Sequence, residues 1–209
     1  DTPIGITAYN WGAEGHINGA TAQADIYGIF GREGLNIGAR WTTPATGSPT
    51  YNAMKVYRNY DGNKSSFGDI SVRATAPNVD NLSVFAAERS SDGKLTVLVI
   101  NKVASTASIR VDLANFAPGS TAEVWQMSGA APAIGRKTDV AVTANSIATS
   151  VPAQSITMFV VPPSGGPMNQ APVANMGASP LTGNAPLLVT FSSDGSNDPD
   201  GDPITFSWN

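Results

Sequence analysis

Cysteine is absent from this 209-residue sequence, and histidine occurs only once, as His16. Without cysteine the chain can form no disulfide, thiolate nucleophile or cysteine-ligated zinc site, and a single histidine excludes sites that need two imidazoles. Charge is also scarce, since twelve basic and sixteen acidic side chains leave a net charge of −4. So few basic residues cannot form the dense cationic surface that nucleic acid or an anionic membrane requires. We therefore expect no nucleic acid and no membrane as partners, and no metal or other cofactor.

No apolar stretch reaches the roughly 18 residues needed to cross a bilayer. A secretory leader is not recognisable either, because the chain opens with Asp1-Thr2-Pro3 and has neither a basic start nor an apolar segment behind it. The sequence does contain 21 glycines and 15 prolines among many serine, threonine and asparagine residues. Such a composition is typical of secreted bacterial proteins. We expect an extracellular protein, either without its leader or beginning inside a longer chain.

Residues 1–61 follow the pattern of two βα units. Short apolar runs predict strands at 4–7 and 35–41, and apolar residues at helical spacing predict helices over 18–31 and 50–60. Strand, helix, strand, helix is the order of a parallel α/β repeat. Two such units cannot close a barrel, and they leave open strand edges and uncovered apolar helix faces. We expect this segment to be a fragment of a larger α/β domain, soluble only when attached to residues 62–162.

Residues 62–162 change the apolar period to two, which predicts an antiparallel β-sandwich that folds on its own. The strand candidates are 70–74, 82–85, 94–101, 108–113, 122–125, 140–142 and 155–161. The turn Ser91-Asp92-Gly93-Lys94 predicts a hairpin with a type I′ turn, because Asp-Gly suits the positive φ angles of that turn. Trp125 and Trp208, each inside an apolar run, are expected in the cores of their domains.

The proline- and glycine-rich stretch 163–170 predicts a linker. After it, residues 171–209 show another β pattern, with apolar runs at 171–174, 187–191 and 204–209. So short a segment is below the size at which a core without cysteine or metal is usually stable. We expect this segment to be the beginning of a further β-domain.

A series of motifs runs through residues 4–162. They are Ile6-Thr7-Ala8-Tyr9-Asn10-Trp11-Gly12, Gly15-His16-Ile17-Asn18-Gly19, Ala22-Gln23-Ala24-Asp25, Ile29-Phe30-Gly31-Arg32-Glu33-Gly34, Arg40-Trp41, Tyr51-Asn52-Ala53-Met54, Tyr57-Arg58-Asn59-Tyr60-Asp61-Gly62, Val99-Ile100-Asn101-Lys102 and Pro152-Ala153-Gln154-Ser155-Ile156-Thr157. Together they resemble glycoside hydrolase family 44, whose members are endo-β-1,4-glucanases and xyloglucanases. The resemblance implies a (β/α)8-like barrel with a β-sandwich packed on it, and a β-1,4-glucan such as cellulose or xyloglucan as the partner. Residues 1–61 would then be the last two βα units of the barrel.

The third segment carries motifs of a second family. They are Ala171-Pro172-Val173-Ala174, Ala185-Pro186-Leu187, Val189-Thr190-Phe191 and Asn197-Asp198-Pro199-Asp200-Gly201-Asp202-Pro203-Ile204. These motifs resemble the start of a polycystic kidney disease (PKD) domain, an immunoglobulin-like sandwich often appended to secreted carbohydrate-active enzymes. The resemblance implies a truncated immunoglobulin-like β-domain. The acidic residues within 198–202 do not occupy the positions at which an EF-hand loop carries its calcium ligands. Two interpretations of this run therefore remain open, a turn with Asx hydrogen bonds and a weak calcium site.

The resemblance to family 44 also points to a missing catalytic group. Retaining glycosidases need two carboxylates about 5 to 5.5 Å apart. The resemblance places the nucleophilic glutamate between Thr7 and Tyr9, where this sequence has Ala8, and the acid/base glutamate upstream of Asp1. A methyl group cannot form a glycosyl ester, so we expect the chain to be inactive as it stands. Glu14, the nearest acid, is expected to be a solvated loop residue.

Aromatic and polar side chains at strand ends form the other part of a glycosidase site, because sugar rings pack on flat rings and their hydroxyls need polar neighbours. The substrate-binding candidates are Tyr9, Asn10, Trp11, Trp41 and His16. Core packing remains the alternative for the aromatic residues, and orientation of the loop backbone for His16. The predicted function is a fragment of a secreted retaining endoglucanase. The competing interpretation is a noncatalytic β-sandwich and PKD module that binds glycan or spaces domains.

Overall fold

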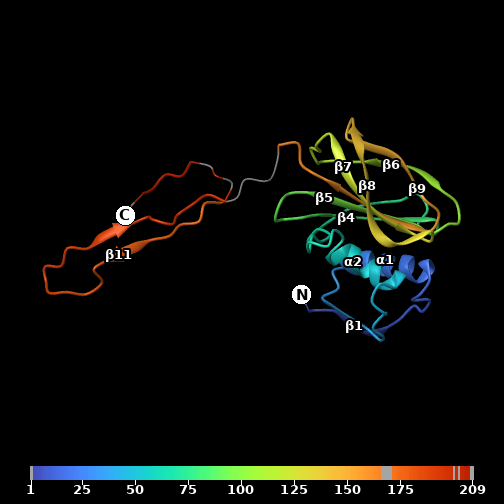
Figure 1. Ribbon diagram of the computed structural model, residues 1–209, viewed down its shortest axis with the longest axis horizontal. Coiled ribbons are helices and arrows are strands. Elements are labelled where there is room, and N and C mark those ends of the chain that lie inside the picture. Colours follow the sequence, from blue (N-terminus) through green and yellow to red (C-terminus); the bar gives the residue numbers. More distant parts are fainter. Residues whose placement is uncertain (1, 166–170, 200, 202, 208–209) are drawn as a thin grey trace. The chain divides into compact units, whose positions relative to one another are not determined.

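The structure is a computed structural model that describes residues 2–165, 171–199, 201 and 203–207. The chain forms two compact units, Asp1–Pro167 and Met168–Asn209 (Figure 1). Within the described ranges, none of the helices has the length and apolarity to cross a bilayer.

The first unit begins with the predicted order of strand, helix, strand, helix. β1 (Gly5–Tyr9) and β2 (Ile37–Arg40) pair in parallel, and α1 (Ile17–Arg32) connects them. α2 (Pro49–Arg58) follows β2 and begins at a capping serine. The helices lie between the β1–β2 pair and the large sheet (Figure 1).

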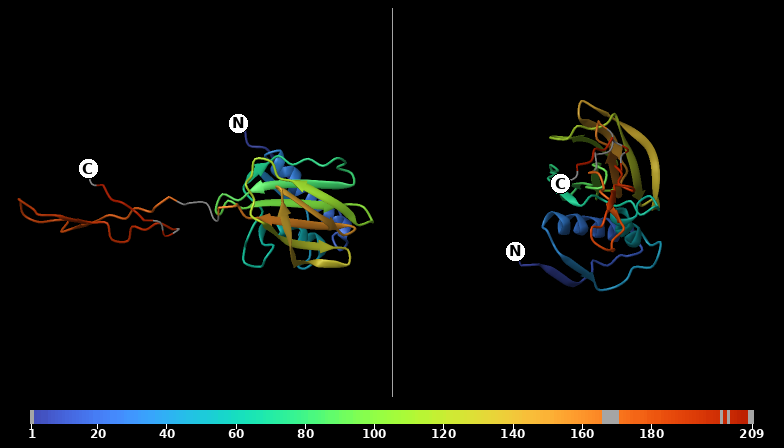
Figure 2. Two further views of the ribbon diagram at one scale, coloured as in Figure 1. Left: turned by 90° about the horizontal axis from the view of Figure 1, so that it is seen from above. Right: turned by 90° about the vertical axis from the view of Figure 1, so that its left-hand side faces the viewer.

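An antiparallel sheet of eight strands makes up most of the first unit. Its order is β3-β4-β5-β10-β7-β8-β9-β6. The bounds are β3 Ile70–Val72, β4 Leu82–Glu88, β5 Leu95–Asn101, β6 Ala107–Asp112, β7 Thr121–Ser128, β8 Ala131–Thr143, β9 Ser146–Val151 and β10 Ser155–Val161. β8 pairs first with β7 and then, through Val142 and Thr143, with β9. The sheet therefore curls into a half-barrel, and both helices cover one of its faces (Figure 2).

Two hydrophobic cores lie on the two faces of this sheet. Between helices and sheet pack Ile17, Ala20, Ala24, Ala53, Val56, Leu98, Ile100, Ile156 and Met158. Inside the curl pack Leu95, Val97, Val99, Ile147, Val151, Phe159 and Val161. Every residue of β5 and β10 is buried, because each of these strands contributes alternate side chains to both cores. Residues 1–61 and the sheet thus share a core.

The predicted hairpin between β4 and β5 is present, but its turn is not type I′. Among residues 90–93 only Gly93 has a positive φ, of 64°, whereas a type I′ turn needs two such residues. The N–H groups of Asp92 and Gly93 both donate to the carbonyl of Arg89, at 3.3 and 2.8 Å. The Arg89 guanidinium in turn binds both carboxylate oxygens of Asp92, at 2.8 Å each. This ion pair stabilises a longer loop than the Asp-Gly pattern predicts.

Two strand predictions and the prediction for Trp125 were incomplete. β9 was not predicted, because its small and hydroxyl-bearing residues show little apolar alternation, yet it pairs with β6 along its whole length. β8 extends well beyond the predicted 140–142. Most of its residues are exposed, so its first part shows no apolar alternation that would predict a strand. Trp125 is only half-buried: it packs on Tyr60 with ring centroids 5.4 Å apart and lies 5.8 Å from the Arg136 guanidinium.

The second unit contains one short antiparallel pair, β11 (Gly177–Ser179) and β12 (Thr190–Ser192). An isolated bridge joins Val173 to Asn197. The strand predicted at 204–209 was wrong for its described part, because residues 203–207 adopt no strand conformation. Trp208, predicted as a core residue, and Asp200 and Asp202, predicted as possible calcium ligands, lie outside the described residues.

The close packing of α1 on the sheet gives a testable prediction at two helical glycines. A Cβ at Gly28 would lie 2.2 Å from Cδ2 of the buried Phe85, whereas a Cβ at Gly31 meets no atom within 4 Å. We expect Gly28→Ala to lower the free energy of unfolding by about 1–3 kcal/mol through overpacking. Gly31→Ala should raise it by about 0.5–1 kcal/mol, because alanine is the better helix former. Urea unfolding of both variants measures the difference, and equal changes would contradict this packing.

Candidate functional site

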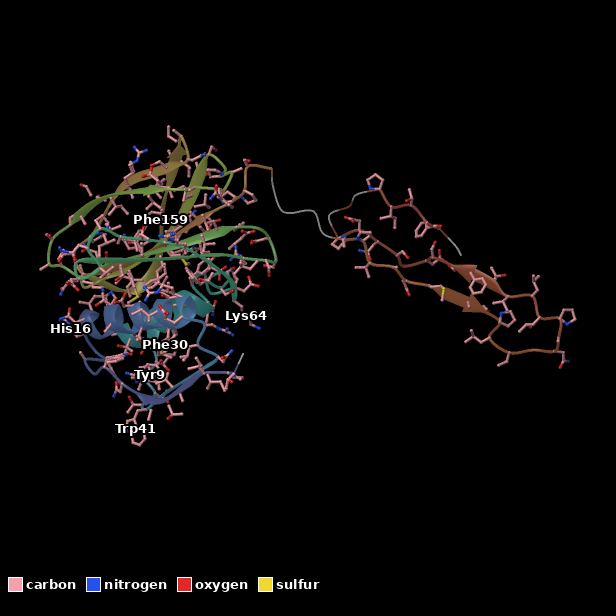
Figure 3. All side chains as sticks on the ribbon, turned by 180° about the vertical axis from the view of Figure 1, so that it is seen from behind. Tyr9, His16, Phe30, Trp41, Lys64 and Phe159 are labelled. Atoms are coloured by element: carbon pink, nitrogen blue, oxygen red, sulfur yellow. The ribbon has the colours of Figure 1, made fainter. Side chains whose placement is uncertain are left out.

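One side of the β1–β2 pair packs toward the helices, and residues on and beside the other side are exposed to solvent. Four large apolar side chains on and beside the pair are strongly exposed: Ile4 at 64%, Trp11 at 55%, Ile37 at 66% and Trp41 at 73%. Figure 3 shows Trp41 pointing away from the body of the unit. These four side chains are candidates for a contact surface.

A β-bulge sets the direction of residue 8. Thr7 and Ala8 of β1 together lie opposite the single residue between Gly38 and Arg40 of β2. Ala8 accommodates the extra residue with a φ of 61°. Both bulge residues are exposed, while the next residue, Tyr9, is only 5% exposed. The position to which the family resemblance assigns the nucleophile therefore faces solvent at the carboxyl end of β1.

The guanidinium of Arg40 connects the elements around this strand end. Its side chain is 6% exposed and forms an ion pair with Glu14 at 2.7 Å. The same group donates hydrogen bonds to Asn10 Oδ1 at 2.9 Å, to Gln23 Oε1 at 3.1 Å and to Thr42 Oγ1 at 2.7 Å. One side chain thus ties together the loop after β1, helix α1 and the segment after β2.

Glu14 lies in the loop after β1, as predicted, but it is only partly solvated because it is part of this network. Its side chain is 31% exposed, and its Oε1 also accepts the hydroxyl of Thr42 at 2.6 Å. The hydrogen bonds from Thr42 and Arg40 hold the pKa of Glu14 below its ordinary value. The carboxylate therefore stays ionised near neutral pH and is poorly suited to donate a proton.

Tyr9 lies beneath the open surface. Its hydroxyl accepts a hydrogen bond from Gln23 Nε2 at 3.1 Å, and its ring packs edge-on against Phe30 with centroids 5.3 Å apart. Figure 3 shows Tyr9 and Phe30 between the strand pair and helix α1. The pKa of Tyr27 is raised above its ordinary value, mainly because the side chain is buried and to a smaller extent because it forms a hydrogen bond with Tyr9. The structure thus places Tyr9 in the packing layer below the exposed strand end.

His16 has a defined local role at the start of α1. Its Nδ1 accepts the backbone N–H of Asn18 at 3.1 Å, which caps the helix. Within the described ranges, no three histidine or acidic side chains gather closely enough to hold a metal ion. Of the five predicted binding residues, Asn10, Trp11 and Trp41 lie at the exposed ends of β1 and β2, while Tyr9 and His16 are engaged within the fold.

Sequence reasoning missed the residues that organise this site, namely Gln23, Arg40 and Thr42. One signal was available for Arg40: it is the sole charged residue between Glu33 and Lys55. A single charged side chain beside an apolar strand and a tryptophan is expected to form an ion pair or hydrogen bonds with specific partners. Its partners come from the loop after β1 and from α1, and neither contact has a sequence signature.

No protein-family model matches the chain. Endoglucanase A of Paenibacillus lautus is 41% identical over 102 residues, which is 48% of this chain and 15% of that protein. The structure of CelM2, a bifunctional glucanase-xylanase from a metagenome library, is similar to this one with a TM-score of 0.76. The two sequences are 58% identical, and the match covers 78% of this chain and 31% of CelM2. A family 44 xyloglucanase from Paenibacillus polymyxa is 29% identical with a TM-score of 0.72, over 77% of this chain and 32% of that structure.

The similar proteins are thus glucanases and xylanases, and the structural neighbours include endoglucanases and xyloglucanases of glycoside hydrolase family 44. Their fold accounts for the curled eight-stranded sheet. The chain spans about a third of the length of these structures and a smaller part of the curated relative.

Proposed function

We propose that the first unit corresponds to the last two βα units and the β-sandwich of a retaining family 44 glycoside hydrolase that cleaves β-1,4-glucan. One observation carries the proposal: Ala8 is exposed on a bulge at the carboxyl end of β1, the end at which barrel enzymes hold their catalytic groups. Because the side chain at this position is a methyl group, the chain itself has no nucleophile there. The chain is therefore inactive in hydrolysis.

The proposed glycan surface consists of Asn10, Trp11 and Trp41. Two exposed indoles offer flat apolar faces to sugar rings. The Oδ1 of Asn10 already accepts from Arg40 and Gly12, and its Nδ2, which donates one N–H to Thr42, has a second N–H for a sugar hydroxyl. Tyr9 and His16, predicted from the sequence as direct ligands, support this surface from below and from the helix start. The substrate class is cellulose or xyloglucan, and the protein acts outside the cell.

We also propose that residues 171–209 belong to a PKD-like immunoglobulin domain and that residues 163–170 link it to the first unit. The sequence motifs within residues 171–204 support this assignment, as does the separation of Met168–Asn209 as a compact unit. In that arrangement the second unit acts as an appended module, and the glycan surface belongs to the first unit alone.

The function is tested by pairing an activity assay with a binding assay. A reducing-sugar assay on xyloglucan and carboxymethylcellulose should show no hydrolysis by the chain. Affinity electrophoresis through gels that contain the same glycans should show retarded migration. Hydrolysis would contradict the role assigned to position 8, and unretarded migration would contradict the glycan surface.

Two tryptophan variants separate glycan contact from folding. Trp41→Ala should weaken retardation in xyloglucan gels and leave the melting temperature nearly unchanged, since the side chain is 73% exposed. The control Trp125→Ala removes the ring that packs on Tyr60 and should cost about 1–3 kcal/mol of unfolding free energy without changing retardation. Equal stability losses for the two variants would show that Trp41 is a packing residue.

A further inference from the structure

Arg40 stands out because it is a nearly buried charge with partners on three separate elements. A guanidinium presents five donors in a rigid fork, and a buried one is costly unless these donors are satisfied. In this chain the fork contacts Glu14, Asn10 and Gln23, as well as Thr42. This use of the fork is specific to arginine, since a lysine ammonium is a single point of charge.

The partners of Arg40 flank the two exposed indoles. Asn10 directly precedes Trp11, and Thr42 directly follows Trp41. Asn10 is held further by a hydrogen bond from its Nδ2 to Thr42 Oγ1 at 3.4 Å and by the N–H of Gly12, which donates to Oδ1 at 3.0 Å. The backbone on both sides of the open strand end is thereby tied to one guanidinium.

We propose that Arg40 is a positioning residue that holds Trp11 and Trp41 in a fixed arrangement, so that they form a preorganised platform for the sugar rings of a β-1,4-glucan. This inference rests on the function proposed above and names the group that organises its site. Fixed ligand groups improve affinity because less conformational entropy is lost on binding. The glycan touches the indoles, and Arg40 acts through its neighbours.

The electrostatics of the site agree with this role. Oε1 of Glu14 takes part in the ion pair with Arg40 and also accepts the hydrogen bond from Thr42. A second buried arginine provides a matched comparison: the side chain of Arg89 is 11% exposed, binds Asp92 at 2.8 Å and donates to the hydroxyl of Tyr60 at 3.0 Å. Arg89 stabilises a hairpin beside Trp125, so it serves as a control with the same chemistry away from Trp11 and Trp41.

The test uses the whole chain labelled with 5-fluorotryptophan, whose ¹⁹F resonances are assigned by single tryptophan-to-phenylalanine variants. Arg40→Met should shift and sharpen the signals of Trp11 and Trp41 and leave that of Trp125 in place. Arg89→Met should do the reverse, because Trp125 packs on Tyr60. Arg40→Lys keeps the charge without the fork, and it should disturb Trp11 and Trp41 as Arg40→Met does. Unchanged signals of Trp11 and Trp41 in Arg40→Met would overturn the proposal.

Binding of a xyloglucan heptasaccharide, measured by calorimetry, gives the second readout. We expect Arg40→Met and Arg40→Lys to weaken affinity at least tenfold and Arg89→Met to change it less than twofold. If Arg40→Met does not fold, Glu14→Gln removes the ion pair with a neutral side chain of the same shape and should move the same two signals. A chain that binds no glycan but shows the predicted signal changes would overturn the proposed function alone.

Discussion

A full-length family 44 hydrolase that carries this chain is expected to gain several orders of magnitude in turnover when Ala8→Glu is introduced, whereas the isolated chain should remain inactive with the same change. In the full-length protein the new carboxylate faces the substrate from the exposed bulge and restores the covalent route through a glycosyl-enzyme. In the isolated chain the attack has no general acid, a contribution of about 10² to 10⁴-fold in typical enzymes. The family resemblance places that acid outside this sequence.

The experiment compares hydrolysis of a β-1,4-glucan by the chain and by a chimaera in which the chain replaces the corresponding part of CelM2, which is 58% identical to it. Each is prepared with Ala8 and with Ala8→Glu. Thr7→Glu is the matched control, because Thr7 is exposed on the same bulge but lies one residue away. Activity of the substituted chain would place the whole catalytic pair within these residues. Equal gains from the two positions would remove the special role of residue 8.

Deleting residues 1–61 is expected to abolish the cooperative unfolding of the eight-stranded sheet. The two helices bury one whole face of β5 and β10, including Leu98, Ile100 and Met158. Without the helices these large side chains are exposed to water, and each fully buried side chain of this kind contributes about 1.5–3 kcal/mol. A domain has only about 5–15 kcal/mol of net stability, so losing the burial of several such side chains removes most of the stability of the sheet.

Calorimetric melting of residues 1–165 and 62–165 measures this effect, together with binding of a dye that reports exposed apolar surface. The longer protein should melt cooperatively, and the shorter one should bind dye and melt without a sharp transition. Residues 1–165 also serve as the control for loss of the second unit, and their melting should match that of the first unit in the whole chain. A sharp transition in residues 62–165 would support the independent sandwich predicted from the sequence.

The strands with strong apolar patterns were predictable from the sequence. β10 was predicted at 155–161, its observed bounds, because a strand buried on both faces shows as a continuous apolar run between polar turns. β9 escaped prediction because its small and hydroxyl-bearing side chains pair with β6 and show no clear period. Local patterns thus identify strands with continuous runs of large apolar side chains. They miss a strand such as β9, whose buried Ile147 and Val151 are separated by small and hydroxyl-bearing residues.

The candidate site was likewise predictable from the sequence only in part. The family resemblance proposed Ala8, and the preference of sugars for aromatic rings at strand ends proposed Trp11 and Trp41; the structure places these residues at or beside the ends of β1 and β2. The Arg40 network was not found, because its partners are separated along the chain by up to thirty residues and meet only after α1 packs against the strand pair. The bulge that exposes residue 8 was also unpredictable, since register depends on the pairing of β1 with β2.

Covalent trapping tests directly whether position 8 is the nucleophile position of a retaining glucanase. The CelM2 chimaera with Ala8→Glu is incubated with a 2-deoxy-2-fluoro-cellobioside that carries a good leaving group, and the labelled peptides are identified by mass spectrometry. We expect one fluorosugar per molecule, attached to the side chain introduced at position 8, and no label on the chimaera with Ala8. A label on another carboxylate, or turnover without any label at position 8, would contradict this assignment.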